Sequence, residues 1–211
     1  MLHMQPLKPE LLNQHGLNLQ FVFNISELPS QLSEPLSNHI GTLHPYRQLI
    51  LIGHGGKALW RALTESDSNT EDPIDHFTID VISRWLSTYH SGTQSVVIYP
   101  TSQDVDLISL GKLAGWHHET PFKSGINQQW GPWFAYRAVI LTDSQFETTP
   151  PSTAPSPCAT CQEKLCISRC PVGACSEQGL DISKCISYRK TQHSSCAKTC
   201  LARISCPVQT Q

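Results

Sequence analysis

Nine cysteines are the residues of this 211-residue chain whose type and spacing could do chemistry, and all lie between Cys158 and Cys206. Residues 1–157 contain none. The block reads Cys158-x2-Cys161-x4-Cys166-x3-Cys170-Pro171, continues through Cys175 and Cys185, and ends Cys196-x3-Cys200-x5-Cys206-Pro207. An odd number cannot pair completely in disulfides, and a cytoplasmic chain keeps its thiols reduced. The pattern therefore favours metal ligation.

Two Cys-Pro endings, at Cys170 and Cys206, favour iron–sulfur clusters. Bacterial two-cluster ferredoxins use three closely spaced cysteines for one 4Fe-4S cluster and send the fourth, which precedes a proline, to the other cluster. Applied here, this rule predicts two ligand sets: Cys158, Cys161, Cys166 and Cys206, and Cys170, Cys185, Cys196 and Cys200. We interpret the remaining Cys175 as a small packing residue. The stretched spacings require loops that bulge around the clusters.

Zinc is the competing metal. Four-cysteine zinc sites use two C-x2–4-C pairs, which Cys158/Cys161 and Cys196/Cys200 could supply. Zinc in such a site would leave five cysteines unused and would not explain the Cys-Pro endings. A decayed site that binds neither metal is a third alternative. All three stay open at this point, with iron–sulfur ligation favoured.

Charge divides along the chain at the same place as the cysteines. From Cys158 onward, seven Lys and Arg face three Asp and Glu, whereas the preceding part has eight against fourteen. A cluster held by thiolates is an anion, so local cations would offset its charge; a basic surface for an acidic partner is the alternative. The formal net charge of −2 gives no general field for nucleic acid or anionic lipid.

No apolar run approaches the roughly 18 residues that span a membrane, and residues 1–20 lack a secretory signal. We therefore expect a cytoplasmic protein with no membrane partner. Hydrophobic residues at 39% are sufficient for a buried core. The sequence shows no Ser-His-Asp series and no carboxylate pair of the kind that would indicate a hydrolase. Gly53–Lys57 lacks the full phosphate-loop pattern and is interpreted as a tight turn.

Apolar periodicity predicts a mixed α/β (α+β) front domain over residues 1–147. Its predicted strands are 19–24, 48–53, 95–99 and 134–141, and its predicted helices are 57–65, 73–89 and 106–114. Asp72 and Pro73 indicate an N-cap and a first-turn proline, and apolar residues from Ile74 to Tyr89 predict one buried face. Residues 148–157, with four prolines, predict a linker. Residues 158–211 are then a small, loop-rich, ferredoxin-like domain.

Several segments together resemble epoxyqueuosine reductase. They are SLGKLAGW at 109–116, WFAYRAVILTD at 133–143, the CPVGA turn at 170–174 and GLDISKCISYRK at 179–190. The front domain is also similar to the CblC cobalamin-processing proteins at 72–82 and 131–139. The resemblance implies a CblC-like, cobalamin-binding front domain joined to a module that holds two 4Fe-4S clusters.

The resemblance further implies a cofactor pocket at Gly115, Trp116, Trp133, Phe134 and Arg137. Arg137 corresponds to an arginine that, in CblC relatives, helps bind a thiol cosubstrate or the surroundings of the cofactor. A structural arginine at a strand edge is the alternative. His117-His118-Glu119 replaces the segment usual in the reductases, and their catalytic acid has no clear counterpart. The helical repeats that help hold tRNA are also missing after Pro207, so we do not expect tRNA as a partner.

These observations predict an iron–sulfur redox protein that passes electrons from two 4Fe-4S clusters to cobalamin, or a similar cofactor, in the front domain. Its expected partners are an electron-donor reductase or ferredoxin, and cobalamin or a small-molecule substrate. Two alternatives remain. One is an electron-transfer protein without cobalamin, and the other is a zinc-stapled interaction protein.

Overall fold

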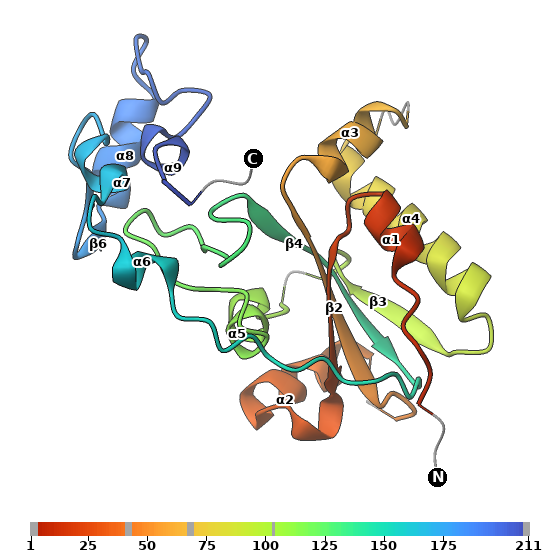
Figure 1. The fold of residues 1–211 in the computed structure, drawn as a ribbon. Helices are drawn as coiled ribbons and strands as arrows, with labels where there is room; N and C mark the ends of the chain where they lie inside the picture. Colours follow the sequence, from red (N-terminus) through yellow and green to blue (C-terminus); the bar gives the residue numbers. More distant parts are fainter. Residues whose placement is uncertain (1–3, 41–43, 67–69, 103, 209–211) are drawn as a thin grey trace. The chain divides into compact units, whose positions relative to one another are not determined.

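A computed structural model describes residues 4–40, 44–66, 70–102 and 104–208. The chain forms two compact units, each visible as a group of elements in Figure 1. The first unit contains Met1–Ala114 and Ala135–Pro151, and the second contains Gly115–Phe134 and Ser152–Gln211. Within the described ranges, no helix is both long enough and apolar enough to cross a bilayer.

The first unit is built on a four-stranded sheet with the strand order β1-β2-β4-β3. Its strands are β1 (Leu19–Asn24), β2 (Gln48–Gly55), β3 (Ser95–Tyr99) and β4 (Phe134–Thr142). β1 pairs antiparallel with β2, and β3 pairs antiparallel with β4. All four predicted strands are confirmed, with β2 extended by two residues and β4 by one. Every residue of β2 is buried, as expected of a central strand.

The helices of the first unit are of two kinds, predicted and unpredicted. The predicted ones are confirmed to within one residue at each end: α3 (Ala58–Thr64), α4 (Pro73–Tyr89) and α5 (Leu107–Leu113). The unpredicted ones are α1 (Glu10–Gln14), the 3-10 turn η1 (Ile25–Glu27) and α2 (Ser30–Ile40). Pro35 lies inside α2, where a proline ordinarily argues against a helix.

Helix α4 supplies much of the core of the first unit. Phe77, Val81, Ile82 and Trp85 are buried, as their spacing predicts. Tyr89 was expected on the same face but is 38% exposed, because it ends the helix. Asp72 is the N-cap residue and Pro73 opens α4, as predicted, but the Asp72 carboxylate accepts no capping hydrogen bond.

The second unit consists of short elements joined by turns. They are α6 (Pro157–Thr160), α7 (Leu165–Ser168), β5 (Cys175–Ser176), β6 (Gly179–Leu180), α8 (Ile182–Arg189) and α9 (Leu201–Ile204). β5 and β6 form an antiparallel hairpin, and α7 packs against both α9 and β5. This arrangement agrees with the expectation of a loop-rich tail.

The limits of the two units differ from the predicted domain limits. Residues 115–134 group with the cysteine-rich tail instead of the front domain, and Phe122 from this segment packs against Cys175 and Ala202. The predicted linker is divided between the units after Pro151. Two hydrogen bonds hold its first part to β1. The Thr149 backbone N–H donates to the Val22 carbonyl, and the Val22 backbone N–H donates to the Thr149 hydroxyl oxygen.

We predict that Gly16→Ala destabilises the first unit. Gly16 has φ +78°, and a Cβ atom there would lie 2.1 Å from the Leu59 backbone nitrogen. Left-handed strain and this clash should lower the free energy of unfolding by about 2 kcal/mol or more, measured by urea denaturation. Gly92→Ala is the matched control, because nothing lies within 4 Å of its added carbon. Equal stability of the two variants would contradict this packing.

Candidate metal centre

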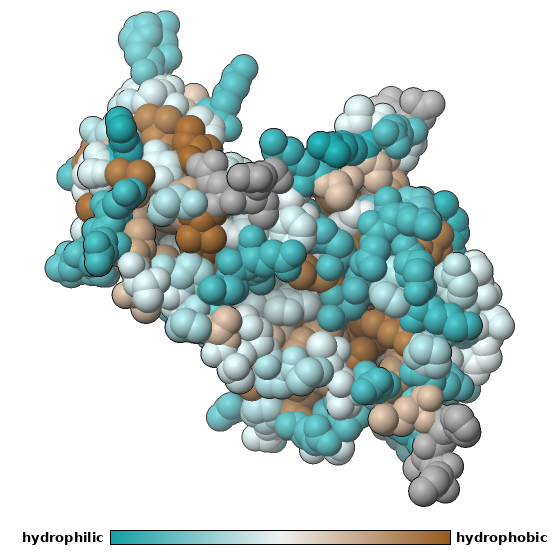
Figure 2. All heavy atoms as spheres, viewed as in Figure 1, coloured by the Kyte–Doolittle hydropathy of each residue, from teal (hydrophilic) through white to brown (hydrophobic). Residues whose placement is uncertain are grey.

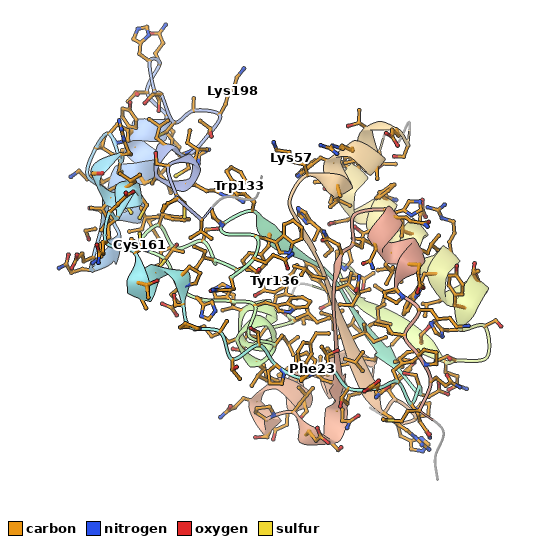
Figure 3. The ribbon with its side chains drawn as sticks, viewed as in Figure 1. Phe23, Lys57, Trp133, Tyr136, Cys161 and Lys198 are labelled. Carbon is orange, nitrogen blue, oxygen red and sulfur yellow. The ribbon has the colours of Figure 1, made fainter. Side chains whose placement is uncertain are left out.

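The first predicted ligand set begins at α6. Pro157 opens this helix, and the Ser156 hydroxyl oxygen accepts a hydrogen bond from the Cys158 backbone N–H at 3.3 Å. This cap places Cys158 in the only turn of the helix and Cys161 at its end. Figure 3 labels Cys161 beside α6. The sequence Ser-Pro-Cys thus fixes the first two thiols of the set by local hydrogen bonding.

The other two thiols of the set come from the packing of α7 with α9. Cys166 lies in α7, and Cys206 follows α9, where its backbone N–H donates to the Arg203 carbonyl at 3.2 Å. Burial raises the pKa of Cys158, and negative charges on Cys206, Cys166 and Cys161 raise it further. Burial, Cys166 and Cys161 likewise raise the pKa of Cys206. The Cys158 thiol is thus within electrostatic range of the other three, and the set as a ligand group stays a prediction.

The second predicted set surrounds a cavity of about 240 Å³. All four of its members line that cavity: Cys170, Cys185, Cys196 and Cys200. Apolar side chains complete much of the wall, among them Phe122, Val172, Leu180 and Ala202. Burial raises the pKa of Cys185, and Cys200, Cys170 and Cys196 add to this effect while Arg189 opposes it. Cys175 lines the same cavity, so five cysteines in all border a partly apolar hollow.

The stretched spacing between Cys161 and Cys166 is accommodated by one left-handed residue. Lys164 has φ 42° and precedes α7, so the chain turns sharply between the two cysteines. Its ammonium group contacts Glu177 at 2.5 Å. A second turn follows Cys170, where Gly173 has φ +57° and its N–H donates to the Cys170 carbonyl. The turn at Lys164 is the bulge expected between Cys161 and Cys166, and the turn at Gly173 belongs to the CPVGA segment.

Cys175, the ninth cysteine, lies between the two sets. Its side chain is 2% exposed and belongs to a small core with Phe122 and Ala202, against which Cys166, Cys170 and Cys200 pack. Burial raises the pKa of Cys175 to about 12, and negative charge on Cys166 contributes to the shift. The thiol is therefore neutral near pH 7, which suits the packing role predicted for it.

Arg203 connects α9 to the 115–134 segment, and sequence reasoning missed it. Its Nε and Nη2 donate to the Pro132 carbonyl at 3.1 and 2.6 Å, and its guanidinium lies 4.5 Å from the centre of the Trp133 ring. Arg203 also lines the cavity of the second ligand set. Burial there lowers the pKa of Arg203, and the nearby Cys200 opposes that shift. The available signal was its position as the single basic residue between Cys200 and Cys206.

The residues predicted for a cofactor pocket are divided between the units. Gly115, Trp116, Trp133 and Phe134 belong to the second unit, where Trp116 and Phe134 are each 8% exposed. Gly115 allows a close approach, since a Cβ atom there would lie 2.2 Å from the Ser152 carbonyl oxygen. Arg137 belongs to the first unit. A common pocket for these residues stays a prediction.

Arg137 on β4 forms a polar pair with His54 on β2. Its Nε donates to His54 Nδ1 at 2.9 Å, and the His54 side chain is buried. Burial lowers the pKa of Arg137, while the charges of Asp75 and Tyr99 oppose this shift. A guanidinium has five N–H donors, and the bond to His54 uses one of them. The pair can therefore bind a further acceptor.

Among the described residues, no three His, Cys, Asp or Glu side chains have the spacing to hold one metal ion. His118 belongs to the second unit, where its Nε2 is buried and has no hydrogen-bond partner within the described part of the chain.

No protein-family model and no curated protein matches the sequence significantly. Solved structures do match. An epoxyqueuosine reductase bound to an epoxyqueuosine-modified tRNA stem loop shares 15% identity and a TM-score of 0.56, covering 96% of this chain and 65% of that one. This chain thus spans about two thirds of the length of that relative.

Two further structures extend the comparison. A catabolic reductive dehalogenase in complex with 3-bromo-4-hydroxybenzoic acid shares 13% identity and a TM-score of 0.57, covering 93% of this chain and 30% of that one. The B12-trafficking protein CblC of C. elegans shares 15% identity over 74% of this chain and 75% of that one, but its TM-score of 0.46 is too low for detailed comparison. The resemblance to epoxyqueuosine reductase is confirmed at the level of the fold.

We predict that Arg203→Gln loosens the 115–134 segment from the tail. The change removes both bonds to the Pro132 carbonyl and the stacking on Trp133, which together should contribute about 1–3 kcal/mol. Hydrogen exchange measured by mass spectrometry should become faster around Trp133. The control is Arg169→Gln, whose side chain is exposed. Unchanged exchange in Arg203→Gln would contradict the tethering role.

Proposed function

We propose that this chain is an iron–sulfur redox protein that holds two 4Fe-4S clusters and delivers electrons to a cobalamin bound by its front domain. The observation that carries the proposal is the cavity lined by Cys170, Cys185, Cys196 and Cys200. These four residues come from separate elements of the tail, and they are the set that the two-cluster ferredoxin rule predicts. Thiolate-ligated clusters supply one-electron transfer at low potential.

The donor chemistry of the tail fits two such clusters. In each predicted group of four, one cysteine is buried, Cys206 in the first and Cys196 in the second, and the other three are half-buried. The cavity of the second ligand set is also lined by Arg189 and Arg203, beside its cysteines. Positive side chains at this place would offset the negative charge of a thiolate-bound cluster, and the apolar wall would limit access of water. The residues would thus hold the clusters and set their potentials.

Cobalamin is the proposed electron acceptor because the fold is that of epoxyqueuosine reductase and the sequence resembles that family. On the front domain, half-buried Arg137 donates through Nε to buried His54, and a guanidinium has four further N–H donors. These donors suit the phosphate or amide groups of a cobalamin. The proposed task of this pair is to bind and orient the cofactor, and the substrate class of the resulting reductase stays open between a small molecule and tRNA.

An electron-transfer protein without cobalamin is the second candidate. One observation favours it: Trp116 and Phe134, expected to line a pocket, are each 8% exposed. Aromatic side chains that contribute to a core are not available to a large planar cofactor. This candidate keeps both clusters and removes only the front-domain cofactor.

We predict that Cys166→Ser and Cys206→Ser each lose one cluster. A serine oxygen replaces thiolate poorly, so iron should fall from about eight to about four per chain, measured by colorimetric iron and sulfide analysis after purification without oxygen. Cys175→Ala is the matched control and should keep all the iron. Full iron content in both serine variants, or iron loss in the alanine variant, would show that the ligand sets are assigned wrongly.

We also predict that cobalamin added to the wild-type protein shifts its visible spectrum, and that Arg137→Leu weakens this binding. Loss of a charged hydrogen-bond donor should raise the dissociation constant about tenfold or more. Arg84→Leu, at an exposed position on α4, is the control, and thermal unfolding checks that each variant is folded. Absence of any spectral response in the wild-type protein would select the candidate without cobalamin.

A further inference from the structure

Helix α8 presents a stripe of residues that is apolar at its centre. Ile182, Cys185, Ile186 and Arg189 follow the spacing i, i+3, i+4, i+7, which places them along one face. The two isoleucines are 57% and 46% exposed, respectively. Exposed isoleucines in neighbouring turns leave apolar surface in water. In Figure 2, hydrophobic residues reach the surface in the region of α7, α8 and α9, among polar ones.

The surroundings of this stripe are basic. Lys184, Arg189 and Lys190 are all exposed at or beside the helix. The acidic residue nearest in sequence is Asp181, whose carboxylate caps the helix by accepting from the Lys184 backbone N–H at 2.9 Å. Helix α8 and its two flanking residues therefore carry a net positive charge, although the chain as a whole has a formal net charge of −2.

The stripe also contains a proposed cluster ligand. Cys185 is half-buried and lines the cavity of the second ligand set. It lies within one helical turn of both isoleucines. A protein seated on Ile182 and Ile186 would therefore lie against the peptide that carries this ligand. Because electron transfer requires close approach of the two redox centres, this location suits the entry of electrons into the second cluster.

We propose that the stripe of α8, formed by Ile182, Cys185, Ile186 and Arg189 with Lys184 and Lys190 at its rim, is the docking surface for an acidic one-electron carrier protein. This proposal rests on the proposed function, because it assigns the electron donor of the second cluster. One electron leaves the reduced carrier and enters the cluster, so the carrier is oxidised by one electron and the cluster is reduced by one. No bond is formed or broken.

The composition of the surface favours a protein carrier over a nucleic acid. Transient protein interfaces have an apolar centre with a polar rim, and charge complementarity mainly accelerates their association. Nucleic-acid backbones instead require cations that follow the phosphates, and exposed isoleucines contribute nothing to such contacts. The central position of Ile182 and Ile186 thus indicates a protein with its own apolar patch inside an acidic rim.

The test measures how fast a reduced acidic flavodoxin reduces the clusters, followed as absorbance loss at about 400 nm. In Lys184→Glu/Lys190→Glu, the second-order rate constant should fall about tenfold or more at low ionic strength. The difference should shrink in high salt, because salt screens exposed charges. Ile182→Ser/Ile186→Ser should lower the rate at both ionic strengths, because apolar contact is not screened.

The matched control is Arg61→Glu/Arg84→Glu, which makes the same change in net charge at exposed positions of the first unit. Reduction by dithionite should be equal in all variants, which shows that the clusters themselves are intact. Equal rates for the α8 variants and the control would overturn the proposal. So would loss of binding to an anticodon stem-loop RNA in the lysine variants with unchanged reduction by flavodoxin, because the surface would then be an RNA site.

Failure of the proposed function can be told apart from failure of the docking surface. If the wild-type protein contains no iron, the proposed function is wrong, and calorimetric titration with flavodoxin then decides the docking proposal. Binding that weakens in Lys184→Glu/Lys190→Glu but not in the control would support the surface. No binding by the wild-type protein would overturn it.

Discussion

Beside the cysteines of the second unit lies a small buried cluster of Phe122, Cys175 and Ala202, and the side chains packed on it are largely cysteines. So small a cluster contributes little against the conformational entropy of ordering the cysteine-rich tail. Metal–thiolate bonds are the interaction that could supply the difference, because each cluster would tie four distant points of the chain together. Short helices, left-handed turns and caps then serve to aim sulfur atoms inward.

The first unit depends on ordinary packing. A central strand that is buried throughout, β2, is covered by the apolar face of α4, with Trp85 fully buried. This core needs no metal. It is also where an unusual polar pair, Arg137 with His54, is held inside a sheet. The first unit is thus a packed scaffold with a half-buried cation, and the second is a cysteine-rich tail, a division that suits the two tasks proposed for them.

Much of this organisation could be predicted from the sequence, and the rest could not for identifiable reasons. Short apolar runs predicted β1 to β4, and apolar residues three and four apart predicted the buried face of α4, because these signals are local in the sequence. The division of the cysteines into two sets, from their spacing and the two Cys-Pro endings, stays a prediction. The membership of residues 115–134 in the second unit could not be predicted, since it rests on contacts such as Arg203 with Pro132, 71 residues apart. Helix α2 was hidden by Pro35, and no pattern placed Phe122 beside Cys175.

The central claim is that each of the two four-cysteine groups holds a 4Fe-4S cluster. Iron, acid-labile sulfide and zinc should be measured together on wild-type protein purified without oxygen, with electron paramagnetic resonance of the reduced sample. The account predicts about eight iron and eight sulfide atoms per chain, no zinc, and signals from two reduced clusters. Stoichiometric zinc without sulfide would contradict it and would remove redox chemistry from this protein.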